Sequence, residues 1–186
     1  MKRVKILLGM LFLLSSMSFA EVPFQFNVME NQMPVSENVN GLRLNLFHGK
    51  TTNVTGVDIN LVALGESDNF KGLQFGFLCA NKVNKSFTGV GLGIANLHTG
   101  PSTGVLWGLV NMSNDVNGLQ VGALNYSTGT TTVDLGLVNI SQSSTFQMGF
   151  VNMTEDLTGV QLGFINMAKN GFLPICPFIN IDGRLF

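Results

Sequence analysis

The chain has 186 residues, of which only 11 % are charged, with ten Lys and Arg against eleven Asp and Glu. This balance excludes the basic surface on which nucleic-acid binding depends. The mean hydropathy is positive, which excludes a disordered chain. The many Gly, Asn, Ser and Thr residues are typical of packed strands with small polar turns, or of a barrel that meets lipid.

The first twenty residues have the form of a bacterial export signal. A basic start precedes an apolar run over 6–14, and Ser18 and Ala20 supply the small residues that a signal peptidase requires. Residues 1–20 are therefore predicted as a signal peptide, and its removal leaves a net charge of 7 − 11 = −4. We expect an exported protein at the outer membrane or cell surface, or alternatively in the periplasm.

An N-terminal extended segment over 21–38 and a single β-repeat domain over 39–186 are expected to follow. One phrase occurs ten times in that domain: an apolar residue, any residue, an apolar residue, Gly, two apolar residues and usually Asn. Neighbouring copies are 13–17 residues apart, which indicates a tandem array of equal structural units. The central position, which we call the pivot, is occupied by Asn45, Asn60, Gly76, Gly93, Gly108, Gly122, Gly136, Gly149, Gly163 and Pro177.

Each copy alternates between two kinds of residue, which predicts a β-strand. The strands are expected near 39–48, 54–64, 70–80, 87–97, 103–112, 117–126, 131–140, 145–153, 158–167 and 173–181. In the copy over 118–126, one face is expected to carry Leu119, Val121, Ala123 and Asn125, and the other Gly118, Gln120, Gly122, Leu124 and Tyr126. We expect the apolar face to be buried.

The opposite face combines the pivot glycine with a polar neighbour. That neighbour is Arg43, Asp58, Gln74, Gln120, Asp134, Gln147 or Gln161. A glycine that recurs within strands indicates close backbone approach or tight curvature. Substitution of Gly136 should therefore be costly, whereas Gln120 and Gln161 are expected to tolerate change.

Two all-β architectures fit the repeat. The first is a small antiparallel barrel-like ring of about ten strands joined by short turns. The alternative is a parallel β-solenoid in which each repeat forms one turn. Strand length favours the barrel. A fixed asparagine position favours the solenoid, where these residues would stack into a ladder: Asn96, Asn111, Asn125, Asn139, Asn152, Asn166 and Asn180. Pro174 and Pro177 suit a terminal cap better than a closing barrel strand.

The motif G-[LV]-Q-apolar-G-apolar-apolar-N resembles that of the uncharacterised surface-repeat proteins of diderm bacteria. The opening over 40–49 and the ending over 170–180 share this resemblance, which covers about 39–181. It implies an exported or surface-associated protein with a shallow, symmetric antiparallel barrel, and it brings no activity or catalytic residue. It tips the fold prediction toward the barrel. Asn45, Asn60 and Cys79 depart from the pattern.

No constellation of catalytic, cofactor-binding or metal-binding residues is predicted. Asp58 and Asp134 belong to distant repeats without an activating neighbour, and His48 and His98 are expected at strand ends or turns rather than as metal ligands. Trp107 replaces an aliphatic residue and is expected to pack in the core, with an interfacial anchor as the alternative.

Two cysteines enter an oxidising compartment if the chain is exported. Cys79 and Cys176 lie in the third and tenth repeats, which separates them in either architecture. We expect two buried, unlinked thiols.

The predicted function is non-enzymatic, without a cofactor. We expect a cell-envelope protein with a structural, lipid-associated or apolar-ligand-binding role, with outer-membrane lipid or a small apolar molecule as its partner. The alternative is a surface-exposed, adhesin-like solenoid that binds a protein or glycan.

Overall fold

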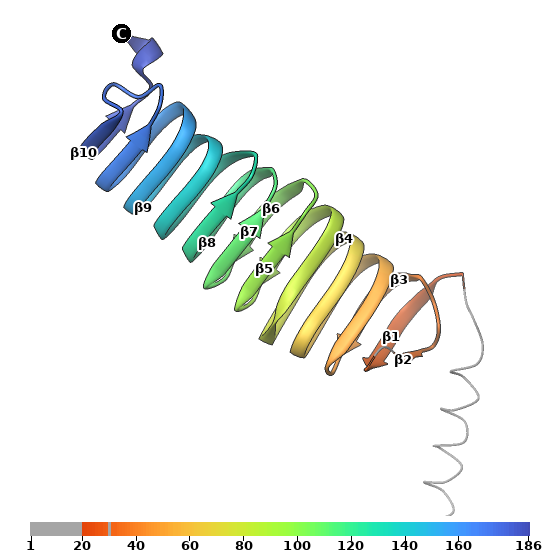
Figure 1. Cartoon of the computed structure of the whole chain (residues 1–186). Helices are drawn as coiled ribbons and strands as arrows, with labels where there is room; N and C mark the ends of the chain where they lie inside the picture. Colours follow the sequence, from red (N-terminus) through yellow and green to blue (C-terminus); the bar gives the residue numbers. More distant parts are fainter. Residues whose placement is uncertain (1–19, 30) are drawn as a thin grey trace, which may run out of the picture.

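The computed structural model describes residues 20–29 and 31–186 and shows a parallel β-solenoid (Figure 1). The predicted signal peptide lies outside the described residues, apart from Ala20. The chain winds into stacked turns along one long axis, and successive turns pair through parallel strands. The all-β prediction is therefore confirmed, whereas the antiparallel barrel is wrong and its solenoid alternative fits.

The strands are β1 (Val22–Val28), β2 (Asn31–Met33), β3 (Asn38–Asn45), β4 (His48–Leu92), β5 (Ala95–His98), β6 (Ser102–Trp107), β7 (Val110–Ser113), β8 (Val116–Ser127), β9 (Thr130–Ala168) and β10 (Ile175–Ile181). A short 3₁₀ helix, Gly183–Leu185, follows. The strands β4 and β9 each continue through several turns of the solenoid.

The chain turns a corner at the pivot, and this corner explains why the length of the expected strands wrongly favoured the barrel. The strand expected over 103–112 is two strands, β6 and β7, separated by Gly108 and Leu109. β6 pairs in parallel with the first half of β8, and β7 pairs in parallel with the second half of β8. One nine-residue phrase thus supplies two sides of a turn, and the few residues left close it.

Residues of adjacent turns pair one-to-one over most of their length, with a register shift between Val116 and Leu119 where β8 pairs with β9. Asn38 to Asn45 pair one-to-one with Asn53 to Asn60, so each residue lies directly over its equivalent in the next turn. The segment 21–38, expected as a separate extended stretch, forms the first turn, because β1 pairs in parallel with β3. Residues at equivalent positions therefore form columns along the axis, such as Asn96, Asn111 and Asn125.

Antiparallel pairing caps both ends of the stack. At the start, β2 pairs antiparallel with β1. At the end, β10 pairs antiparallel with β9, and it carries Pro177, while Pro174 immediately precedes it. The prolines thus lie in a terminal cap, as the sequence suggested. Arg184 joins this cap to the body by donating from Nη2 to the carbonyl oxygen of Leu157 at 2.9 Å.

The interior is polar, opposite to expectation. In the turn around Gly122, Gln120 and Asn125 are buried, whereas Leu119, Val121 and Ala123 face outward. The predicted faces are therefore inverted before the pivot, and the corner shifts the alternation, so Asn125 is buried on the same side as Gln120 instead of lying with Leu119 and Val121. Amides at equal heights in successive turns hydrogen-bond along the axis, which favours a polar column in the interior. Apolar side chains are also buried in the interior, among them Val39, Val54, Phe70, Phe87, Val116 and Leu157, although Ser102 lies between Phe87 and Val116 in their column.

Two glycine columns follow from close approach between turns. A Cβ added at Gly136 would lie 2.5 Å from the carbonyl oxygen of Gly122 and 2.8 Å from Nδ2 of Asn125. Gly104 has a φ of +125°, and its added Cβ would overlap the carbonyl oxygen of Gly89. The predicted cause of the pivot glycine, a neighbouring strand, is correct. Gln161 is instead fully buried and donates to Oε1 of Gln147 at 2.8 Å, so the tolerance expected there is not supported.

We predict that Gly136→Val destabilises the protein, because overpacking against Gly122 outweighs the higher strand propensity of Val. The expected loss in the free energy of unfolding is about 1–3 kcal/mol, measured by denaturant titration. Leu137→Val is the matched control, since it introduces the same residue one position away at a side chain that is 64 % exposed. Equal stability of the two variants would contradict the steric account.

Candidate binding surface

A continuous asparagine ladder occupies the interior and fixes the stacking of the turns. Successive side-chain amides donate Nδ2 to Oδ1 at 2.8 Å from Asn96 through to Asn166. The members of the ladder are Asn27, Asn45, Asn60, Asn81, Asn96, Asn111, Asn125, Asn139, Asn152 and Asn166. The predicted ladder is thus confirmed from Asn96 to Asn166, and it extends back to the first turn. Asn180 lies in the antiparallel cap and donates to the carbonyl oxygen of Leu173 instead.

Asparagine and glycine exchange places between the early and late turns. Around Gly136 the pivot is glycine and the facing residue is Asn139. In the first turns the pivot is Asn45 or Asn60, and the residue that faces it is Gly49 or Gly65, where an added Cβ would overlap the asparagine amide. The interior thus holds one asparagine opposite one glycine, which explains the departures from the repeat at positions 45 and 60.

The second amide hydrogen of several ladder asparagines is donated to a backbone carbonyl at the corner of the solenoid. Asn111 Nδ2 also donates to the carbonyl oxygen of Val121 at 3.0 Å, and Asn125 Nδ2 donates to that of Leu135 at 3.0 Å. Asn81, Asn139 and Asn152 make the same bond one turn ahead, to Leu92, Met148 and Leu162. The ladder therefore satisfies backbone carbonyls at the corner from inside.

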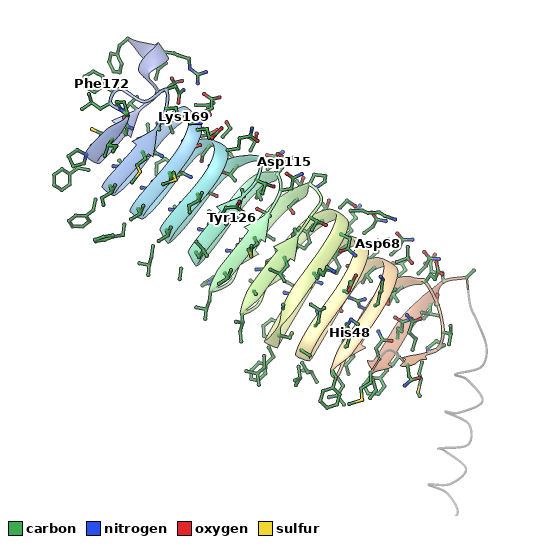
Figure 2. The ribbon with its side chains drawn as sticks, in the orientation of Figure 1. His48, Asp68, Asp115, Tyr126, Lys169 and Phe172 are labelled. Atoms are coloured by element: carbon green, nitrogen blue, oxygen red, sulfur yellow. The ribbon has the colours of Figure 1, made fainter. Side chains whose placement is uncertain are left out.

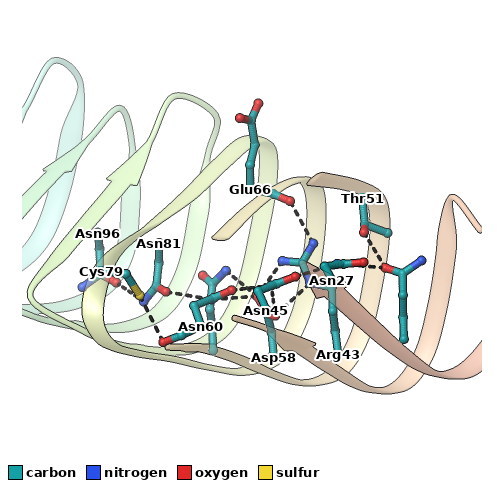
Figure 3. A network of polar contacts seen from close by, with 12 residues as sticks. Asn27, Arg43, Asn45, Thr51, Asp58, Asn60, Glu66, Cys79, Asn81 and Asn96 are labelled. Atoms are coloured by element: carbon teal, nitrogen blue, oxygen red, sulfur yellow. Dashed lines mark hydrogen bonds and ion pairs between the residues drawn. The ribbon is translucent and has the colours of Figure 1, made fainter. Parts of the chain in front are cut away.

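A buried ion pair lies beside the ladder in the early turns (Figure 3). Arg43 donates Nε and Nη2 to the two carboxylate oxygens of Asp58 at 2.8 and 2.6 Å. Gln74 donates to the same carboxylate at 2.9 Å, and Arg43 Nη1 donates to the carbonyl oxygen of Glu66 at 2.8 Å. Arg43, Asp58 and Gln74 are fully buried, so this network holds the turns together and offers no reactive surface.

Asp134 is a buried carboxylate that accepts hydrogen bonds from neutral donors. Gln120 Nε2 donates to Oδ1 at 3.0 Å and Thr131 Oγ1 donates to Oδ2 at 2.6 Å, with Ser144 and Gln147 at 3.3 Å. Burial raises the pKa of Asp134, and these hydrogen bonds offset part of that rise. Asp58 and Asp134 lie in separate interior networks, so the structure does not bring them together as an acid and base.

The histidines and cysteines are built into strands. His98 ends β5, its Nδ1 lies 2.9 Å from Oγ of Ser102, and burial lowers its pKa to about 3, which keeps it neutral. His48 begins β4 and lies 4.0 Å from the Glu66 carboxylate.

Both thiols are free: Cys79 is buried, with its pKa raised to about 11 mainly by burial, whereas Cys176 is half-buried. Across residues 20–29 and 31–186, no group of three such side chains is placed to hold a metal ion.

The main surface feature is an apolar ridge at the corner of the solenoid. Its crest column follows the pivot position and consists of Phe77, Ile94, Leu109, Ala123, Leu137, Phe150 and Phe164. One flanking column consists of Phe75, Leu92, Trp107, Val121, Leu135, Met148 and Leu162. The other consists of Leu78, Ala95, Val110, Leu124, Val138, Val151 and Ile165. Figure 2 shows mostly carbon side chains along one long edge and polar ones, with Asp68, Asp115 and Lys169, along the opposite edge.

The ridge is unusually exposed. Ten of its side chains are at least 40 % accessible: Phe75, Phe77, Leu78, Ile94, Trp107, Leu109, Leu137, Met148, Phe150 and Phe164. If each exposes roughly 100 Å², the patch is on the order of 1,000 Å², against about 300–600 Å² for the largest patch of a typical monomer. Trp107 is 62 % exposed, so its predicted place in the core is wrong. Patches of this size mark interaction sites.

Two shallow hollows lie on or near the ridge. One, of about 620 Å³, runs over the pivot glycines between the crest and the flanking column that contains Phe75 and Trp107. The other, of about 670 Å³, lies on the adjoining face near the C-terminal cap and includes Tyr126, Met153 and Ile175 in its lining. Sequence reasoning missed this surface because it assigned the apolar columns to the core.

No family model matches the chain, and no significant match exists among the curated proteins or the solved structures compared with it. The resemblance to bacterial surface-repeat proteins therefore stays a prediction. Within the described part of the chain, no helix is long and apolar enough to cross a membrane.

We predict that Asp58→Asn strongly destabilises the protein, because it leaves the buried Arg43 guanidinium without its counter-charge. The expected loss is about 3–5 kcal/mol in the free energy of unfolding, measured by denaturant titration. Asp68→Asn is the control: its carboxylate pairs with Lys85 at 2.8 Å on the surface, where an ion pair contributes about 0–1 kcal/mol. Similar losses in both variants would show that the buried pair has no special weight.

We also predict a pH-dependent effect of Asp134→Asn. A carboxyl group whose pKa is raised by folding binds its proton more tightly in the folded state, so it favours folding at low pH. That contribution is lost as the pH rises above about 4. The variant should therefore gain stability relative to the parent between about pH 4 and pH 7 in denaturant titrations at several pH values. Parallel pH profiles would refute this, and the exposed Asp115→Asn serves as the control.

Proposed function

We propose that this protein is an exported, non-catalytic β-solenoid that binds a partner through its apolar ridge. The single observation that carries the proposal is the exposure of ten large apolar side chains in adjacent columns. Leaving such an area in water is costly, since each Å² of apolar surface contributes about 25 cal/mol when it is covered. The partner is therefore expected to present an apolar surface.

The distribution of polar groups supports a binding role over a catalytic one. Asp58, Asp134, Arg43 and His98 are all buried and bonded to interior partners. The exposed charges near the ridge's opposite edge form surface ion pairs, such as Lys169 with Glu155 at 2.7 Å and Lys85 with Asp68 at 2.8 Å. The exposed columns of the ridge consist of hydrocarbon side chains, which favours an apolar partner over a glycan.

Rigidity also supports this role. The ladder and the one-to-one pairing of adjacent turns hold the crest residues at the spacing between paired strands, about 4.8 Å. Phe150 and Phe164 in successive turns stack with ring centroids 4.8 Å apart, and Phe164 lies 6.1 Å from Phe178 of the cap. A pre-organised row of this kind loses little side-chain entropy on binding, which favours association.

We predict that the protein partitions into the detergent-rich phase of a phase-separating nonionic detergent. The double substitution Leu109→Ser with Leu137→Ser should lower the partition coefficient at least tenfold, because it removes two crest side chains that are 62 % and 64 % exposed. Thr88→Ser with Thr103→Ser is the matched control, since it introduces the same residue at two exposed positions of the polar side. Circular dichroism checks that all three proteins retain their strands. Retention of the parent in the aqueous phase would refute the proposal.

A further inference from the structure

We infer that the partner of the ridge is the hydrocarbon region of a lipid leaflet, into which the solenoid inserts edge-on. This inference rests on the proposed function and names the chemistry of the partner. The crest from Phe77 to Phe164 spans seven turns, or about 29 Å at the spacing between paired strands. This part of the edge would thus lie in the membrane surface, with the opposite edge in water.

The charge distribution matches a lipid surface. Residues 86–154 contain only two charged side chains, Asp115 and Asp134. Asp134 is buried in the interior, and Asp115 lies on the edge opposite the ridge (Figure 2). Nothing on this stretch of the ridge therefore carries a charge into hydrocarbon. The cross-section has one apolar and one polar side, as do elements that lie in a membrane interface.

Many backbone groups at the corner are hydrogen-bonded within the protein. Gly108 N donates to the carbonyl oxygen of Val121 at 3.0 Å, Val110 N to that of Ile94 at 3.1 Å, and Ala123 N to that of Leu109 at 2.9 Å. The carbonyl oxygens of Val121 and Leu135 also accept from the asparagine ladder at 3.0 Å. In hydrocarbon each unpaired backbone group costs several kcal/mol. The bonds to neighbouring turns and to interior amides reduce that cost at the corner.

The convex shape favours a fluid partner over a second copy of the chain. Phe77 and Leu78 are consecutive, yet both are 60 % exposed, because the chain turns a corner there and the columns face different directions. A patch of about 1,000 Å² exceeds the roughly 800 Å² per partner that a standard interface buries. However, two convex crests would touch along a line and leave the flanking columns exposed. Lipid chains surround a crest and cover all three columns.

Trp107 provides an internal probe of this insertion. It is the single tryptophan of the chain, it belongs to the flanking column of the ridge, and it is 62 % exposed. Transfer of this indole from water into a leaflet shifts its emission to shorter wavelength. Bromine on lipid acyl chains quenches the emission only when the ring lies among those chains.

The test uses the full chain expressed in an exporting bacterial host, with vesicles of zwitterionic phosphatidylcholine. Any contribution of residues 1–20 is common to the parent, the Leu109→Ser/Leu137→Ser variant and the Thr88→Ser/Thr103→Ser control. We expect the parent to float with the vesicles, with a blue shift and quenching of Trp107. The crest variant should show at least tenfold weaker partitioning. The control should bind the vesicles as strongly as the parent. Binding should also persist in about 0.5 M salt, because insertion of the ridge does not involve charge.

Several outcomes would overturn the inference. Failure of the parent to float, or equal binding by the crest variant and the parent, would exclude insertion of the ridge. Loss of binding at high salt would indicate headgroup attraction instead. A concentration-dependent dimer that the crest substitutions abolish, without vesicle binding, would identify a second copy as the occupant. Partitioning into detergent without vesicle binding would leave the proposed function intact and refute only the lipid partner.

Discussion

The structure depends on one interaction, the hydrogen bond between side-chain amides of asparagines in successive turns. An asparagine offers one acceptor and two donor hydrogens. In this interior Oδ1 accepts from one neighbour, one hydrogen goes to the next asparagine, and the other goes to a corner carbonyl, as at Asn111 and Asn125. Because the amides must lie at equal heights, the ladder fixes the register of the turns. The outer columns of side chains, including the ridge, are held in the same register.

The narrow interior explains the inverted polarity of the fold. A wide sheet sandwich buries its aliphatic face, but a turn of about 14 residues leaves room for one asparagine opposite one glycine. Gly49 faces Asn45 early in the chain, and Asn139 faces Gly136 later. Apolar residues next to the pivot, such as Leu109 and Leu137, point outward instead. An exposed hydrophobic edge is therefore a direct result of an amide-filled interior, and it becomes useful if a partner covers it.

Much of the fold was predictable from the repeat, and particular residues show where the prediction stopped. The constant spacing of Asn96 to Asn166 correctly indicated a ladder, whereas the alternation around Gly122 placed Asn125 on the wrong face. The corner at Gly108 was not predicted, because the extended residues on both sides of it have the pattern of one continuous strand. The orientation of the faces was missed because hydrophobic burial was assumed. Nothing in the sequence alone reveals how wide the interior is, and that width decides which face turns inward.

The antiparallel caps have a consequence for the length of the protein. A stack of parallel turns ends in a row of unpaired backbone groups, which can template further strands from another chain. Here the terminal strands reverse direction, and Pro177 offers no N–H at one end. In-register asparagine stacking between identical segments is also the packing found in amyloid fibrils. The caps therefore oppose the addition of strands from other chains at either end of the stack. They favour a discrete molecule over a growing fibre.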